Sequence, residues 1–389
     1  MHLGRFHAVI DDLARHFKFA DLHTKLEVCA TALENYTSSK DAIQLDAFRQ
    51  GLAKFYSAAE IIDPDLLQPY ALQVIEDIDI KQSLSPLLIE KVKEIVADRS
   101  FDHVGLIGDL RNLGQKIVKK TNSIAAINNA FTHLDVELER VHSEGESPDA
   151  EIGLLFPREA VGETLKELAA EFSALNKMFR AINELTGAQD YDPCVRTISS
   201  SWWQIFVELD PNQIIVWVLA VERIVGLFKS NLEIKKLQKE LTENNISKNI
   251  TDLLDKEIEE KVAEEINKLA SDLRKNHAKI TDENRLNEIE NQLRFSLRHL
   301  AKRINQGGQV EINVALPNEP ADLIPAEDGQ PIDPVLLEDL AVKRARLKEL
   351  RDLRQRARLA STRTVEIELD GQLLLMGNDA QGEDIDPLA

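Results

Sequence analysis

Histidines near the N-terminus are the first residues whose chemistry could build a site. His16 and His23 lie seven residues apart, and His7 lies close to two aspartates. Zinc ligands on one helix usually stand four residues apart, and loop ligands have a defined spacing. A helix break expected between 17 and 21 also separates the faces of His16 and His23. We therefore interpret these histidines as surface or packing residues and predict no metal site.

The motifs of covalent and phosphate chemistry are missing from the sequence. No Ser, Cys or Thr lies in a nucleophile elbow, and the run from Gly105 to Gly108 lacks the third glycine and the Lys-Ser/Thr pair of a phosphate loop. Acidic residues are so frequent that none can be singled out as a general acid or base. Cys29 and Cys194, the only cysteines, have no metal or redox spacing. We predict that the protein is not an enzyme, with no cofactor and no small-molecule substrate.

All three tryptophans lie in the most apolar stretch of the chain, 202–228. Two capping boxes, Ser201-x-x-Gln204 and Asp210-x-x-Gln213, predict a short helix followed by a long one. This hairpin could be a buried centre, a subunit interface or a concealed membrane-active element. We favour burial, because the charged residues in its middle are costly in hydrocarbon. The interface or membrane candidates are Trp202, Trp203, Phe206, Ile214, Trp217, Val221, Ile224 and Phe228.

A basic stretch at 343–358 contrasts with the acidic rest of the chain. Its eight cations oppose Glu349 and Asp352, which gives a local charge of +6 in a chain of −20. Contact with nucleic acid or anionic lipid is one interpretation, but no aromatic residue alternates with the cations to stack on unpaired bases. We favour docking on an acidic surface of the same chain or of a neighbouring subunit. The basic-patch candidates are Lys343, Arg344, Arg346, Lys348, Arg351, Arg354, Arg356 and Arg358.

Composition supports a folded, mainly helical protein. The 389 residues are 43% hydrophobic and 29% charged but only 5% aromatic, which suits two or three domains of long helices. The charge of −20 disfavours generic nucleic-acid binding, because an acidic surface repels phosphate. The N-terminus has no signal-peptide pattern, and no stretch of about 18 apolar residues occurs. We therefore expect a cytoplasmic protein.

Apolar residues spaced by three and four predict the domains that must position these candidates. Residues 1–145 should form an N-terminal helical bundle, followed by a polar linker at 143–156. Residues 157–306 should form long, coiled-coil-like helices around the apolar hairpin, because beyond 228 each apolar stripe narrows to about one residue per turn.

Residues 309–389 should form a small C-terminal module with an acidic tail. Alternation at 310–316 predicts one strand, and a helix should follow from 334 to 360. Two more strands are predicted around the turn Asp370-Gly371, between 365 and 375. The expected fold class is thus mainly α, a multi-helix bundle with long coiled-coil-like helices and a three-strand, one-helix α/β module.

The leading functional hypothesis is a non-enzymatic helical scaffold or interaction protein that self-associates. Narrow apolar stripes need partners, so we expect a homo-oligomer, a protein partner or both. The first alternative is a cytoplasmic, pore-forming-like effector that inserts 202–228 into a membrane on activation. The second, less favoured, is nucleic-acid association through 343–358.

Overall fold

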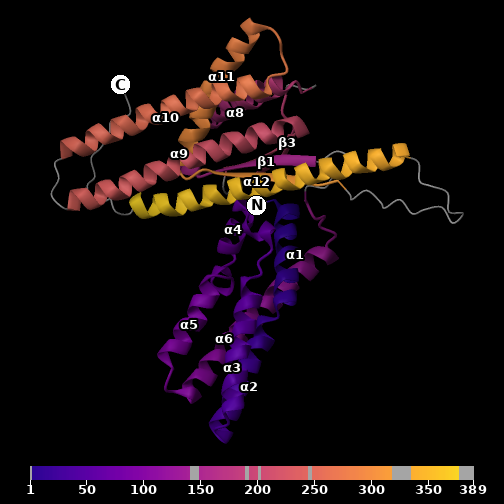
Figure 1. Ribbon diagram of the computed structural model, residues 1–389, viewed down its shortest axis with the longest axis vertical. Helices are drawn as coiled ribbons and strands as arrows, with labels where there is room; N and C mark the ends of the chain where they lie inside the picture. The colour runs from indigo at the N-terminus through magenta and orange to yellow at the C-terminus, as the bar shows by residue number, and fades with distance from the viewer. Residues whose placement is uncertain are drawn as a thin grey trace, which may run out of the picture. The chain divides into compact units, whose positions relative to one another are not determined.

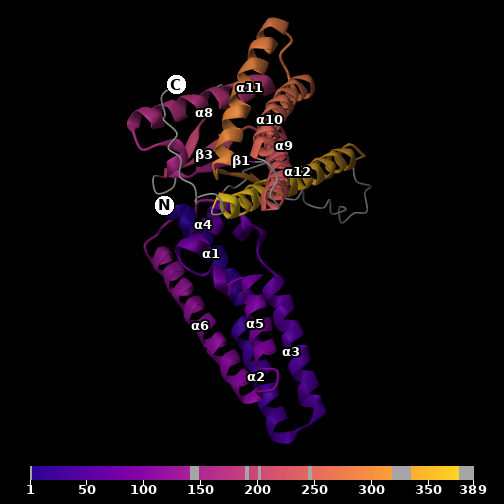
Figure 2. The same ribbon diagram turned by 90° about the vertical axis from the view of Figure 1, so that its left-hand side faces the viewer.

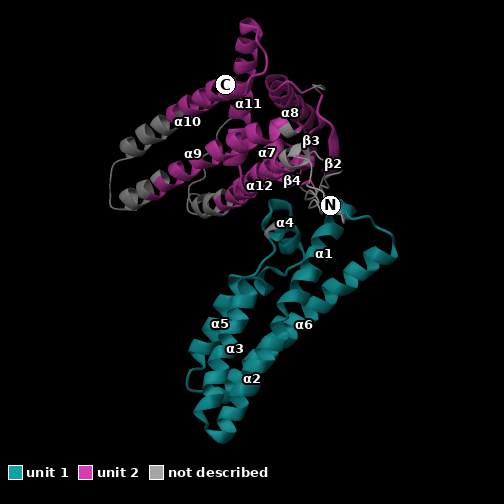
Figure 3. Cartoon of the chain, turned by 45° about the vertical axis from the view of Figure 1, so that its right-hand side comes forward, with its two compact units in different colours: residues 1–140 teal, residues 141–389 magenta. Residues whose placement is uncertain are grey.

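The computed structural model describes residues 2–140, 149–188, 192–199, 203–243, 248–317 and 334–375. The chain divides into two compact units, 1–140 and 141–389 (Figure 3). Helices dominate the described residues, and one four-stranded sheet accompanies them. The predicted mainly α class is therefore confirmed.

Unit 1 is a helical bundle. Helix α2 packs against α3 and α6, and α1 packs against α6. Their apolar faces meet in one core, in which Leu26 and Leu33 of α2, Phe55 of α3 and Leu110 of α6 are fully buried. The elements are α1 (Leu3–Ala20), α2 (Leu22–Ser39), α3 (Ala42–Glu60), η1 (Pro64–Leu67), α4 (Pro69–Asp77), η2 (Lys81–Ser83), α5 (Leu87–Asp98) and α6 (His103–His133).

Unit 2 is built around an antiparallel sheet with the strand order β2-β3-β1-β4. Ile152 of the central strand β1 lies opposite Val207 of β3 and Ile312 of β4. Helices α8 and α11 pack side by side over the sheet (Figure 2). The elements are β1 (Asp149–Phe156), α7 (Arg158–Val161), α8 (Leu165–Thr186), β2 (Val195–Ser199), β3 (Trp203–Leu209), α9 (Pro211–Glu243), α10 (Lys248–His277), α11 (Glu283–Asn305), β4 (Gln309–Ala315) and α12 (Pro334–Leu375).

The linker predicted at 143–156 is wrong for its described part, 149–156, which forms β1. Ala150, Ile152 and Leu154 point into the main core of the unit, and the other face of the strand is buried as well. A strand covered on both faces appears in the sequence as a short apolar run, which periodicity does not separate from a loop or a helix. The polar residues before it hid this signal.

The short helix predicted at 202–209 is also wrong, because 203–209 forms β3. Trp203, Ile205 and Val207 alternate onto the core face of the sheet, which is the period of a strand. The second capping motif is real. Asp210 Oδ1 accepts from the Asn212 amide at 2.9 Å, and the Asp210 amide donates to Gln213 Oε1 at 3.3 Å. The apolar hairpin is thus a strand followed by helix α9.

The C-terminal strands are confirmed only at 310–316, which corresponds to β4. Residues 365–375, predicted as a hairpin, continue α12. Helical spacing keeps Ala357, Ser361 and Thr364 on the side of α12 that contacts β4, and this packing outweighs the local turn signal. Both β4 and α12 belong to the same compact unit as the helices of 157–306.

Helix α12 covers the outer edge of β4. The amide of Ile312 donates to Ser361 Oγ at 3.0 Å, and that of Val310 donates to Thr364 Oγ1 at 3.3 Å. Ala357 and Ala360 are fully buried beside these hydroxyls, and their small side chains allow the helix to come close. Edge strands expose unpaired backbone groups that need such cover. The hydroxyl groups of α12 therefore close this end of the sheet.

Removing these hydroxyls should destabilise unit 2. In the double variant Ser361→Ala, Thr364→Val, two buried amides of β4 lose their acceptors, and we expect a loss of about 2–4 kcal/mol in the free energy of unfolding. Urea unfolding followed by tryptophan emission measures it, since all three tryptophans lie in unit 2. Thr362→Val is the control, because Thr362 Oγ1 donates only to a carbonyl of its own helix. An equal loss in both variants would contradict the edge-capping role.

Candidate interaction surface on helix α12

The apolar candidates form core, not surface. Trp203, Phe206, Ile214, Trp217, Val221, Ile224 and Phe228 are all buried in unit 2, and Trp202 lies outside the described residues. The Trp217 ring lies 4.9 Å from that of Phe179 on α8, and Trp203 stacks on Phe156 with ring centroids 5.7 Å apart. The part of α9 from Ile214 to Phe228 is apolar on most sides because helices and the sheet surround it. Within the described part of the chain, no helix is both long and apolar enough to cross a bilayer.

The basic candidates lie on α12, which runs beside α9 (Figure 1). The C-terminal half of this helix docks on β4 and α9 through small residues. Its N-terminal half is much more open, since every side chain from 341 to 346 is exposed and Leu347 is the only buried one among the described side chains at 339–354. The exposed cations are Lys343, Arg344, Arg346, Lys348 and Arg351, while Arg354, Arg356 and Arg358 are half-buried.

Internal ion pairing of the kind expected from the sequence occurs at Arg356. Its guanidinium donates to Glu222 of α9 at 2.6 Å and 3.3 Å, and these hydrogen bonds raise the pKa of Arg356. Lys343 pairs with Asp339 of its own helix at 3.2 Å. Farther along, Lys229 of α9 pairs with Glu366. Docking on α9 thus uses the C-terminal half of the basic stretch and leaves the cations of the N-terminal half at the surface.

Three of the exposed cations share one side of the helix. Arg344, Lys348 and Arg351 stand at spacings of four and three residues, which places them in one row along an α-helix. The half-buried Arg358 continues the row after Gln355. We call Arg344, Lys348, Arg351 and Arg358 the basic stripe. At 1.5 Å per residue it is about 21 Å long, a suitable row of donors for several anionic groups.

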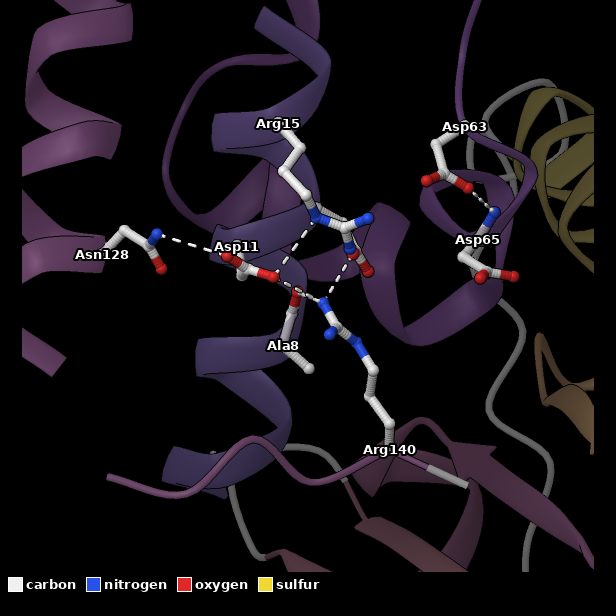
Figure 4. Close-up of polar contacts among 8 residues, drawn as sticks. Ala8, Asp11, Arg15, Asp63, Asp65, Asn128 and Arg140 are labelled. Atoms are coloured by element: carbon white, nitrogen blue, oxygen red, sulfur yellow. Dashed lines mark hydrogen bonds and ion pairs between the residues drawn. The ribbon is translucent and has the colours of Figure 1, made fainter. Parts of the chain in front are cut away.

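A second charged cluster lies in unit 1 (Figure 4). Arg140 donates to Asp11 at 2.9 Å, to Asp12 at 2.6 Å and to the Ala8 carbonyl at 3.2 Å, and Arg15 also pairs with both aspartates. Burial raises the pKa of Asp11, but the hydrogen bond from Arg140 and its positive charge lower it by more. The pKa of Asp11 therefore lies below the ordinary value of an aspartate. These contacts fasten the end of the unit to α1, which is a structural role.

The histidines singled out in the sequence have packing roles. His7 Nδ1 donates to the Val136 carbonyl at 2.7 Å. His16 is buried, which lowers its pKa, and nearby Asp63 only partly offsets this effect. Among the described residues, no group of three His, Cys, Asp or Glu side chains is placed to hold a metal ion.

A buried triad that sequence reasoning missed joins α8 and α11. Glu171, only 2% exposed, accepts from His299 Nε2 at 2.7 Å and from Arg303 Nε at 3.2 Å. Arg303 Nη1 also donates to Gln306 at 2.9 Å and to the Ala160 carbonyl. Such a triad could orient a histidine base, but these further contacts fasten Arg303 to neighbouring elements, so we assign the triad a structural role. In the sequence, Glu171 occupies a position that has the helical spacing of the apolar residues around it. A carboxylate at such a position was the one sequence signal that could have pointed to this triad.

Comparison with protein-family models, curated proteins and solved structures finds no match for this chain. The assignment of a function therefore depends on the surfaces described above.

Proposed function

We propose that this chain is a non-enzymatic, cytoplasmic interaction protein that binds an anionic partner through the exposed cations of α12. The observation that carries the proposal is the exposure of Lys343, Arg344, Arg346, Lys348 and Arg351 on a helix whose apolar side is used internally. Hydrogen bonds between such cations and phosphate, sulfate or carboxylate are about twice as strong as neutral ones. An acidic chain that concentrates cations on one exposed helix has a defined place for such a partner.

Retention on heparin, a sulfated polyanion, tests this proposal. The variant Arg344→Gln, Arg346→Gln, Lys348→Gln, Arg351→Gln should elute at clearly lower salt than the wild type, because four exposed cations are gone. The matched control is Lys54→Gln, Lys91→Gln, Lys116→Gln, Lys119→Gln, which removes the same charge from exposed positions of unit 1. The control should elute with the wild type. Equal shifts in both variants, or no retention of the wild type at low salt, would contradict the proposal.

Self-association is the second candidate, and one observation favours it. Strand β2 ends the sheet, and no described strand pairs with its outer edge, whereas α12 covers the edge of β4. Val195 and Ile198 are exposed on β2. Pairing of two such edges around a two-fold axis would join two sheets into one. Light scattering should then give a dimer that Ile198→Lys weakens, and a wild-type monomer at all concentrations would end this candidate.

A further inference from the structure

We infer that the anionic partner of α12 is double-stranded nucleic acid, which the basic stripe contacts along the phosphate backbone. This inference rests on the proposed function and names the partner class for the same surface. Three properties of α12 distinguish a duplex from the other polyanions that a basic helix could bind.

The first property is the absence of aromatic residues. The sequence of α12, from Pro334 to Leu375, contains no Phe, Tyr, Trp or His. Proteins that bind single strands without sequence preference combine cations with aromatic rings on which the bases stack. A helix with cations alone can neutralise phosphates but offers nothing to unpaired bases. This composition favours a duplex, whose bases are already stacked, over a single strand.

The second property is the position of the apolar side of the helix. Helices that bind anionic membranes insert an apolar face beside their cations. In α12 this face is occupied where Ala357 and Ala360 pack into the core of unit 2, and Leu347 is buried as well. Among the described side chains of α12, at 339–366, Val342 and Leu359 are exposed, but they belong to opposite halves of the helix and form no continuous face. Over its described side chains, α12 therefore offers solvent its charge and no apolar face that could insert into a bilayer.

The third property is the openness of the N-terminal half. All side chains at 341–346 are exposed, and the same holds for Lys348, Glu349, Arg351 and Asp352. A helix with its side chains is about 10–12 Å wide, which matches the width of the major groove of DNA. Arg344, Lys348 and Arg351 share one row, so they can reach successive phosphates of one strand together. Two of these three are arginines, whose planar guanidinium binds phosphate through two parallel hydrogen bonds.

The net charge of −20 shapes this binding rather than prevents it. The acidic remainder of the chain repels phosphate at a distance, so contact must be confined to α12. We therefore expect little binding beyond that made by the stripe and a strong dependence on salt. Each phosphate contact adds about 0.9 to the slope of log K against log salt for duplex DNA.

A comparison of two charge-matched variants tests the inference with the full chain and a fluorescent duplex of random sequence. The stripe variant is Arg344→Gln, Lys348→Gln, Arg351→Gln. The control, Lys261→Gln, Lys268→Gln, Lys275→Gln, removes three exposed cations of α10 in the same unit, outside the proposed binding surface. The stripe variant should bind about a hundredfold more weakly near 0.1 M salt and lose about three from the salt slope. The control should lose less than a third of that slope, because its cations act only at a distance.

Parallel titrations separate this inference from the proposed function. Stripe-dependent binding of the duplex, with weaker binding of single-stranded DNA and of vesicles rich in phosphatidylserine, supports a duplex partner. If heparin retention depends on α12 but the duplex is not bound, or if single strands or vesicles bind more tightly than the duplex, the duplex inference is overturned and the anionic surface stands. If heparin retention is also independent of α12, both the duplex inference and the proposed function are contradicted. Circular dichroism of each variant confirms that α12 is retained.

Discussion

Arg303→Met should destabilise unit 2 by about 3–5 kcal/mol, because it leaves the buried carboxylate of Glu171 without its strongest cation. Arg303 contacts both oxygens of Glu171 and also binds Gln306 and the Ala160 carbonyl. His299 alone then remains to compensate a side chain that is 2% exposed. Urea unfolding followed by tryptophan emission reports the loss for unit 2.

Two further variants show whether the buried charge is the cause. Arg298→Met removes an exposed arginine of the same helix and should cost less than about 0.5 kcal/mol. Glu171→Gln combined with Arg303→Met should recover part of the loss, because a neutral amide is cheaper to bury than a carboxylate. If the loss in the free energy of unfolding for the double variant equals the sum of the losses for Glu171→Gln and Arg303→Met, packing rather than charge holds α8 to α11.

The same triad gives unit 2 a dependence on pH. Burial raises the pKa of Glu171, but hydrogen bonds and charges from His299 and Arg303 lower it to below its ordinary value of about 4.3. A carboxyl group with a lowered folded pKa stabilises the fold above its unfolded pKa, and this stabilisation is lost as the pH falls through the folded value. We expect the wild type to lose stability below about pH 4.3 more steeply than Glu171→Gln, in which this titration is gone. Parallel profiles for the two proteins would contradict the assignment.

Gly153→Val should cost unit 2 about 3 kcal/mol through overpacking in the sheet. A Cβ atom at Gly153 would lie 2.4 Å from Cε1 and 2.8 Å from Cδ1 of Phe206, the residue directly opposite on β3. The Phe206 ring is itself buried, so it has little room to move. Strand β1 is central, and a shift there also disturbs its pairing with β4. Tryptophan emission during urea unfolding again measures the effect.

Gly226→Ala on α9 is the matched control, because a Cβ atom there meets nothing within 4 Å. In an exposed helical position alanine should stabilise by about 0.5–1 kcal/mol. Gly153→Val combined with Phe206→Leu should recover part of the loss, since the smaller side chain vacates the ring's place. A destabilisation that Phe206→Leu leaves unchanged would show that the ring is not the obstacle.

Several features of this protein follow from local pattern alone. The helices of unit 1, the stop of α8 at Gly187 and the start of α9 after Asp210 all follow from residue spacing and capping residues. These signals are local, because a helix satisfies its own backbone within four residues. The excess of cations at 343–358 is equally a property of the sequence, and the structure adds only which of them face outward.

The sheet was decided by tertiary structure. Strand β1 needs β3 and β4 on its two edges, and these partners lie about 50 and 160 residues away in the chain. Periodicity within 149–156 or 203–209 carries no record of that pairing. The same holds for 365–375, where contacts of α12 with β4 and α9 extend a helix through a stretch that resembles a hairpin. Local preferences there are worth tenths of a kcal/mol per residue, and the packing of the preceding turn, in which Ser361 and Thr364 are buried, outweighs them.

For the candidate site, too, the sequence determined one part and the tertiary structure another. Sequence identified the cations of α12, but it could not tell that Arg356 would turn to Glu222 while Arg344, Lys348 and Arg351 remained exposed. The sequence also did not decide whether the tryptophan segment lies in the core, at an interface or in a membrane. Only the packing of α9 on the sheet places Trp203 and Trp217 in the core. Residue types determined which chemistry the chain carries. Which of those side chains meet water depended on the partners that folding brought from distant parts of the chain, because burial is a property of the assembled core.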